Sequence, residues 1–410
     1  MTSPLSAVAA ALEAHRHDTV ELLQALVRTP STNPPGDTRE VASIVQRYLD
    51  GAGIATELVG VDDDRPCVVA RVGAQEGPVL GFNSHLDTVG VGEASDWPPG
   101  GPFCGRIDGG SVWGRGAGDA KASVAAMCVA AAVLNGIGEQ WSGGVLLALV
   151  SEEETGGSNG TGFLLDAGLG DADAWVVGEL TRNQVAIAER GIVWIELETI
   201  GRAAHASTPE RGVSAIDGML ELLQRIRTEV APGLIKATHP LTPPGSLNIG
   251  LLRGGTQPNV VADRCVAVLD CRLVPGQDPS ALEAELRALV ADHARRDRSA
   301  DARMRTLLAG SPFETDAEAP VVVAARAACR AAGLADDVVG FDQTCDARFY
   351  AERGIPTIVF GPGDPAVAHT SREHVAVADL EAAVRVYANL AVEYLGGDRS
   401  PLAPAGAATR

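Results

Sequence analysis

The chain is 410 residues long and carries a formal net charge of −20 at pH 7. A chain of this length exceeds what one hydrophobic core usually supports, so we expect two domains. The negative charge would repel nucleic-acid phosphates and argues against a nucleic-acid partner, while the 46% share of hydrophobic residues is typical of an ordinary globular protein and excludes a disordered chain.

Strand and helix signals alternate over the first 180 or so residues. Apolar runs predict strands at 68–72, 79–83, 145–150 and 174–177, and helical patterns predict helices at 5–28, 38–52, 121–135 and 159–167. Continuous apolar strands separated by helices are typical of an α/β fold with a mostly parallel sheet, covered by helices on both faces.

The pattern changes near residue 184. Two extended runs within 184–200 precede a helix at 212–229, strands at 246–252 and 260–273, and a helix at 279–296. This order resembles an inserted ferredoxin-like α+β domain. After about 305 the α/β rhythm returns, with a helix at 317–332, a strand at 356–360 and a helix at 377–395. We therefore predict a discontinuous sheet domain (1–183 and 305–396), an inserted domain (184–304) and a disordered tail (397–410).

The cysteines and the apolar segments bear on the cellular compartment. Seven cysteines without a CxxC pair indicate buried, unpaired thiols in a reducing compartment. The first residues lack a basic leader, so we expect no signal peptide. We expect no stretch to match the ~20 apolar residues of a membrane span. These observations predict a cytoplasmic protein that does not bind membranes.

Acidic residues and histidines follow several predicted strands. They are His85 and Asp87 after 79–83, Glu152 to Glu154 after 145–150, Glu179 after 174–177, and His369 after 356–360. Strand ends at one edge of an open α/β sheet converge, and ligands bind there. Imidazole and carboxylate ligands suit zinc or a similar divalent ion. The sequence therefore predicts a metal site at this edge.

Each position also has a simpler interpretation. His85 could be a solvated loop histidine, and the three successive acids could form a solvated loop. Asp119, at the end of a glycine-rich run, could cap a helix or bridge two cations. A dinucleotide-binding motif is disfavoured, because Asp119 occupies its third glycine position. The common location at strand ends favours metal binding, and adjacent carboxylates suit one ligand and one proton carrier.

Taken in order, these segments resemble the di-zinc acetylornithine deacetylase, succinyl-diaminopimelate desuccinylase, aminoacylase and carboxypeptidase G family, over roughly residues 15–395. The resemblance implies two divalent ions, most simply Zn²⁺, with Co²⁺ or Mn²⁺ as alternatives. One ion would take His85, Asp119 and Glu179, and the other Asp119, Glu154 and His369. Glu153 matches the general base, and Asp87 the residue that orients His85. A cis peptide bond between Asp119 and Ala120 is also implied.

The predicted insert and the segment after it carry further matches. His205 resembles a histidine that polarises the substrate carbonyl, and Asn259 and Arg272 resemble residues that hold a substrate carboxylate. Thr344 and Arg348 lie in a segment that resembles a substrate-facing loop. Surface ion pairs are the alternative for both arginines. Pro365 stands where desuccinylases often have an asparagine, which argues against that particular activity.

The resemblance implies a metal-dependent amidohydrolase that cleaves an N-acyl amino acid or a similar amide, by metal-activated water with Glu153 as base. A dipeptidase or carboxypeptidase of the same chemistry stays open. So does a catalytically silent, metal-stabilised binding protein. In relatives with this plan the inserted domains pair edge to edge. The resemblance therefore implies a homodimer, in which His205 acts in its own or in the partner's site.

Overall fold

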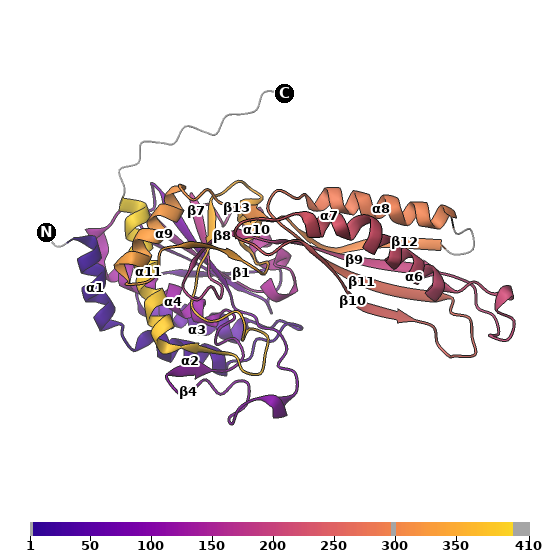
Figure 1. Cartoon of the computed structure of the whole chain (residues 1–410). Coiled ribbons are helices and arrows are strands. Elements are labelled where there is room, and N and C mark those ends of the chain that lie inside the picture. Colours follow the sequence, from indigo (N-terminus) through magenta and orange to yellow (C-terminus); the bar gives the residue numbers. More distant parts are fainter. Residues whose placement is uncertain (1–2, 297–300, 397–410) are drawn as a thin grey trace. The chain divides into compact units, whose positions relative to one another are not determined.

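The computed structural model describes residues 3–296 and 301–396. The chain divides into two compact units, which are drawn together in Figure 1 and described separately below. The first unit comprises Met1–Val185, Ala317–Val338 and Ile355–Arg410, and the second comprises Ala186–Asp316 and Val339–Gly354. The tail that was predicted to be disordered, 397–410, lies outside the described residues.

The first unit is built on a mostly parallel sheet, which confirms the predicted fold class. Its strands run in the order β1-β2-β6-β3-β7-β15. In that order their bounds are Thr56–Val59, Cys67–Gly73, Gly144–Val150, Val79–His85, Ala174–Val177 and Thr357–Val359. The strands β6, β3, β7 and β15 pair in parallel, whereas β1 and β2 are antiparallel.

Both faces of this sheet are covered. The strands β3 and β6 are buried along their whole length, as expected for parallel strands between two layers. Successive strand residues point to opposite faces. Phe82 packs against Tyr387 of α11 (Val377–Gly396), with ring centroids 5.4 Å apart. The next residue, Asn83, donates a hydrogen bond to Thr161, just before α5 (Phe163–Asp166). The helix α11 therefore covers one face, and the segment leading into α5 covers the other.

The helix α4 (Lys121–Ile137) is the central helix of the first unit and contacts both α2 and α11. Lys121–Gln140 has the length and apolar composition of a membrane span, contrary to the expectation from the sequence, but 78% of that window is buried within the protein. The other helices here are α1 (Pro4–Ala14), α2 (Asp18–Arg28), α3 (Arg39–Gly51) and α9 (Pro320–Ala331).

The second unit contains a four-stranded antiparallel sheet in the order β10-β11-β9-β12. In that order the bounds are Ser246–Gly254, Arg264–Leu273, Gly191–Ile200 and Asp301–Gly310. The helices α6 (Ala215–Arg225), α7 (Ala231–Lys236) and α8 (Pro279–Arg296) lie over one face (Figure 1). The chain order β-α-β-β-α-β with this strand order is ferredoxin-like, as predicted.

Shorter elements complete the fold. The strand β8 (Val185–Glu189) pairs with β13 (Phe313–Glu314) and β14 (Val338–Phe341), and α10 (Ala347–Ala351) follows. In the first unit, β4 (Arg106–Asp108), β5 (Ser111–Trp113) and β16 (His374–Ala376) form a separate three-stranded sheet.

The second unit is longer than the insert expected at 184–304. That boundary falls inside β12, where Arg303 and Arg305 stand opposite Glu198 and Glu196 of β9. An ion pair of 2.9 Å joins Arg305 to Glu196. The strand β12 alternates charged and apolar residues and lacks the continuous apolar run of the strands in the first unit. For this reason the sequence analysis did not predict it.

Candidate metal centre

A cluster of histidines and carboxylates lies at the ends of four neighbouring parallel strands. His85 is the last residue of β3, and Glu153 and Glu154 lie just after β6. Glu179 follows β7, and His369 follows β15 further along the chain. Asp119 lies just before α4, across a cis peptide bond to Ala120. Parallel strands present their carboxyl ends at one edge of the sheet, where ligands bind in α/β folds.

Asp119 stands between two histidines. Its Oδ1 lies 3.1 Å from Nε2 of His85, and its Oδ2 lies 3.1 Å from Nε2 of His369. Glu179 joins the His85 side, with 3.6 Å between Oε1 and Nε2. Glu154 joins the His369 side, with 3.3 Å between Oε2 and Nε2. The donors thus form two sets that share Asp119, in the grouping that the family resemblance implied.

These donors fit a pair of divalent cations. Ligand atoms of His85, Asp119 and Glu154 lie within 4.8 Å of one another, and those of His85, Glu153 and Glu179 do the same. Imidazole nitrogens with carboxylate oxygens are a donor set for zinc and for neighbouring transition metals. An anionic, largely buried carboxylate cluster also needs positive charge to be stable.

In the absence of a cation, protonated histidines provide that charge. Hydrogen bonds to Asp119 and Glu154 raise the pKa of His369 to about 10. Burial lowers the pKa of His85, but Asp119 and Asp87 outweigh burial and raise it overall. The pKa of Asp119 is lowered, because the two histidines outweigh its burial. A metal ion must displace these protons, so metal binding releases protons and weakens as the pH falls.

Asp87 organises the cluster more widely than the sequence indicated. It is fully buried, and its two oxygens accept hydrogen bonds from the backbone N–H groups of Glu153 (3.2 Å) and Glu154 (3.3 Å). Asn33, which the sequence analysis missed, donates a further bond of 2.8 Å to Asp87. Nδ1 of His85 lies 2.9 Å from the backbone oxygen of Asp87, and this contact orients the ring.

The turn after β6 separates three successive acids. Glu152 has a left-handed backbone with φ of 73°, and its carboxylate accepts the N–H of Asn159 at 2.6 Å. Glu154 is anchored on both sides, because Oε1 accepts the N–H of Val89 and Oε2 lies beside His369. Glu153 lies within reach of His85 and Glu179. Only the second and third acids therefore belong to the cluster.

His205, predicted to polarise the substrate carbonyl, and the predicted substrate-binding residues belong to the second unit. His205 is exposed, and the segment around it pairs with the segment of Asn259, whose backbone oxygen accepts the N–H of Ala206 at 3.0 Å. Arg272 donates to Thr344 at 3.2 Å and forms an ion pair of 2.8 Å with Asp270. These residues form two pairs, His205 with Asn259 and Arg272 with Thr344.

Arg348 differs from the expectation, and Arg190 was not predicted. Arg348 is buried and donates to the backbone oxygen of Cys345 at 2.9 Å, so it supports the loop from within. Arg190, which the sequence analysis missed, lies beside this loop, because its backbone oxygen accepts the hydroxyl of Thr344. Its guanidinium donates to the carbonyl of Asp342. Burial, and then the charge of Arg272, lower the pKa of Arg190, and both arginines form a hydrogen bond with Thr344.

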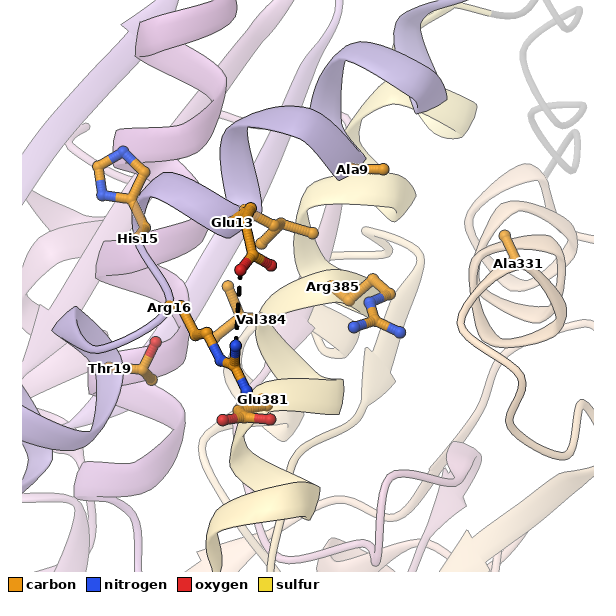
Figure 2. Close-up of a pocket in the computed structure, with 10 residues that line it drawn as sticks. Ala9, Glu13, His15, Arg16, Thr19, Ala331, Glu381, Val384 and Arg385 are labelled. Atoms are coloured by element: carbon orange, nitrogen blue, oxygen red, sulfur yellow. Dashed lines mark ion pairs between the residues drawn. The ribbon is translucent and has the colours of Figure 1, made fainter.

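A pocket of about 480 Å³ lies elsewhere in the first unit, between α1, the start of α2, α9 and α11 (Figure 2). Glu13 and Arg16 form an ion pair of 3.5 Å at its wall. Glu381 and Arg385 of α11 also line it. Its lining does not include the histidines and acids of the cluster, so this pocket is separate from the candidate metal centre.

Two histidines and several acids at the carboxyl edge of a parallel sheet are the arrangement of a metal-dependent hydrolase. The chain belongs to peptidase family M20/M25/M40, whose family model matches residues 81–393. Family membership and the donor cluster together make it a metallohydrolase of amide bonds.

Named relatives and solved structures are similar over most of the chain. An acetylornithine deacetylase from Myxococcus xanthus is 31% identical, covering 86% of this chain and 88% of its own. A succinyl-diaminopimelate desuccinylase from Paracoccus denitrificans is 30% identical over 84% of this chain and 90% of its own. An M20 family metallo-carboxypeptidase from Sulfolobus solfataricus matches the fold with a TM-score of 0.79 at 18% identity. The match covers 92% of this chain and 99% of the carboxypeptidase.

Proposed function

We propose that the protein hydrolyses the amide bond of an N-acyl amino acid and releases the acyl group as a carboxylic acid. The observation that carries this proposal is the Asp119 carboxylate, each oxygen of which lies 3.1 Å from a different histidine. Such a carboxylate is suited to join two cation sites. When bound, two Zn²⁺ ions, or Co²⁺ or Mn²⁺, supply an acidified water and polarise the substrate carbonyl. The deacetylase and desuccinylase names of two relatives support this substrate class.

His85, Asp119, Glu154, Glu179 and His369 are the ligands in this proposal. Glu153 is the general base: it takes a proton from the attacking water and gives it to the leaving amine. The contacts of Glu154 support this division, because Val89 and His369 hold its two oxygens. Asp87 orients the His85 ring and fixes the backbone of both glutamates.

His205 is a candidate donor to the oxyanion that forms on the substrate carbonyl. The backbone N–H of Ser207 donates to its Nδ1 at 3.1 Å. An Nδ1 that accepts a hydrogen bond places the ring proton of a neutral histidine on Nε2. The exposed Nε2–H is then available to an oxyanion, and such donors stabilise the transition state of acyl transfer.

In this proposal the substrate carboxylate binds to a cluster of two arginines and a threonine, which are Arg190, Arg272 and Thr344. Thr344 joins the two arginines, because its hydroxyl donates to the backbone oxygen of Arg190 and accepts a hydrogen bond from Arg272. Asp270 pairs with Arg272, and the charges of Asp342 and Asp270 also act on Arg190. In a chain with a net charge of −20, two neighbouring arginines are candidates to hold an anionic group, because arginine binds carboxylates with good geometry.

A substrate panel tests the proposal. Acetyl, succinyl and formyl derivatives of several amino acids are compared with their carboxamides and with dipeptides, using protein loaded with two equivalents of zinc. Arg190→Met and Arg272→Leu should each lower kcat/KM for the acids by about 10- to 100-fold, the worth of a charge-assisted hydrogen bond. The carboxamides should change little.

Arg253→Leu is the matched control, because Arg253 is exposed on β10 of the same unit. Equal losses on acids and carboxamides would refute the carboxylate-binding role. Preference for dipeptides would assign the protein to the peptidases of its family. Two bound metal ions without turnover of any amide would favour a binding protein instead.

A further inference from the structure

The segment after His369 is attached to the segment that precedes Asp119. The strand β16 pairs antiparallel with β5, with His374 opposite Trp113. The N–H of Gly114 donates to the backbone oxygen of Glu373 at 3.2 Å. Two metal-ligating regions that are distant in sequence are thus joined by a short strand pairing, next to the cluster that they build.

The Glu373 side chain adds a second connection. Its Oε1 accepts two backbone N–H groups, those of Gly118 and Asp119, each at 3.0 Å. Its Oε2 accepts a hydrogen bond from Arg115. Both side chains are buried, with 0% of Glu373 and 2% of Arg115 exposed. Arg115 also donates to the backbone oxygen of Gly90 and lies over the Trp97 ring.

This carboxylate fixes the peptide groups on the N-terminal side of Asp119. The direction of a side chain follows from the backbone that carries it. Asp119 uses one oxygen for His85 and the other for His369, so a rotation of its backbone would disturb both contacts at once. Glu373 lies on the same segment as His369, and it therefore ties the position of that histidine to the orientation of Asp119.

We propose that Glu373 is a positioning residue for both cation sites, because it holds the Asp119 backbone through two accepted hydrogen bonds. This inference rests on the ligand set of the proposed function. Arg115 compensates the charge of Glu373 and is not itself required for the orientation of Asp119. Removing a group that orients metal ligands typically weakens metal binding by about 10- to 100-fold.

Two double variants test the proposal. Arg115→Met/Glu373→Gln and Arg115→Met/Glu373→Leu both remove the buried ion pair as a unit, so neither leaves a single buried charge. Glutamine keeps an oxygen that can accept the two N–H groups, whereas leucine has a similar size and no acceptor. The dissociation constants for Zn²⁺ are measured on metal-free protein by competition with a chromophoric chelator. The leucine variant should bind zinc about 10- to 100-fold more weakly than the glutamine variant.

Asp173 provides the matched control. Its carboxylate accepts the backbone N–H of Val79 at 2.7 Å, at the end of β3 that lies opposite His85. Asp173→Asn and Asp173→Leu should lower the melting temperature at most and leave zinc affinity unchanged. Equal zinc affinities in the two double variants would overturn the proposal, even if their melting temperatures differed.

A third variant covers the case in which the leucine protein does not fold. In the single variant Glu373→Gln, the amide NH₂ must face either Arg115 or the two backbone N–H groups. It should therefore bind zinc more weakly than Arg115→Met/Glu373→Gln, and absence of this rescue would also overturn the proposal. The zinc dissociation constants are measured without any substrate. If the wild-type protein binds two zinc ions but hydrolyses no amide, the proposed function fails while this inference stands.

Discussion

Glu153 and Glu154 are neighbours in sequence with different surroundings. Glu154 is held on both oxygens, whereas Glu153 faces His85 and Glu179. Glu153→Gln should therefore keep both metal ions and lower kcat by about 10²- to 10⁴-fold, the usual contribution of a general base. Glu154→Gln should lose metal as well as activity. Metal analysis and steady-state kinetics on both variants check this. Loss of metal in Glu153→Gln alone would reverse the two roles.

The sequence predicted which residues enter the cluster better than it predicted what holds them. His85, Asp119, Glu154, Glu179 and His369 each follow a strand or precede a helix, so a local pattern marks them. Glu373 and Asn33 carry no such mark, and Arg190 follows β8 but is not a residue type that binds metal. Their contacts join segments that are far apart in the chain, and only the folded structure brings these segments together.

The end of β8 carries a buried acid. Glu189 is not exposed, and it accepts hydrogen bonds from the N–H (3.1 Å) and the Sγ (2.9 Å) of Cys345. Burial raises the pKa of Glu189 to about 8, from 4.5 in an unfolded chain. Between these values the unfolded state loses its proton while the folded state keeps it. The contribution of Glu189 to the free energy of unfolding is therefore complete below pH 4.5 and is lost as the pH rises through about 8.

Glu189→Gln should remove this pH dependence, because an amide does not titrate. Its oxygen can still accept the N–H of Cys345, and its NH₂ can donate to the Sγ of Cys345. Relative to the wild type, the free energy of unfolding of the variant should rise between pH 5 and pH 8 by an amount on the order of a few kcal/mol. Urea denaturation at several pH values measures it. The same substitution at the exposed Glu210 controls for the loss of one acid. A constant difference across the pH range would show that Glu189 does not titrate there.

Elements with a strong apolar pattern were predicted well, and elements defined by their partners were not. The buried strands β3, β6 and β7 and the helix α4 lie where the sequence placed them. The single helix expected at 5–28 is two helices, because α1 ends at Ala14 and α2 begins at Asp18. The carboxylate of Asp18 forms a hydrogen bond with His15 in the turn between them. The strands β4, β5 and β16 are three residues each, too short for a periodic signal.

The assembly of the whole molecule stays a prediction. His205 belongs to the second unit and the metal cluster to the first. We propose a two-fold homodimer, the commonest oligomer, in which His205 serves the site of the partner. Inactive His205→Ala and inactive Glu153→Gln subunits should then complement each other. After subunit exchange, half of the dimers would hold one intact composite site, so about a quarter of full activity should return. No recovery despite proven exchange would refute this arrangement.

The division of the first unit along the chain has a consequence for biosynthesis. A ribosome adds about 5–20 residues per second, so His85, Asp119, Glu154 and Glu179 emerge early and His369 emerges late. The whole second unit is synthesised in between. Until β15 and the residues after it leave the ribosome, the nascent sheet lacks a strand, and Asp119 lacks one of its two histidines. With the proposed ligands, complete metal loading therefore requires nearly the entire polypeptide, and a truncated chain would lack a complete pair of cation sites.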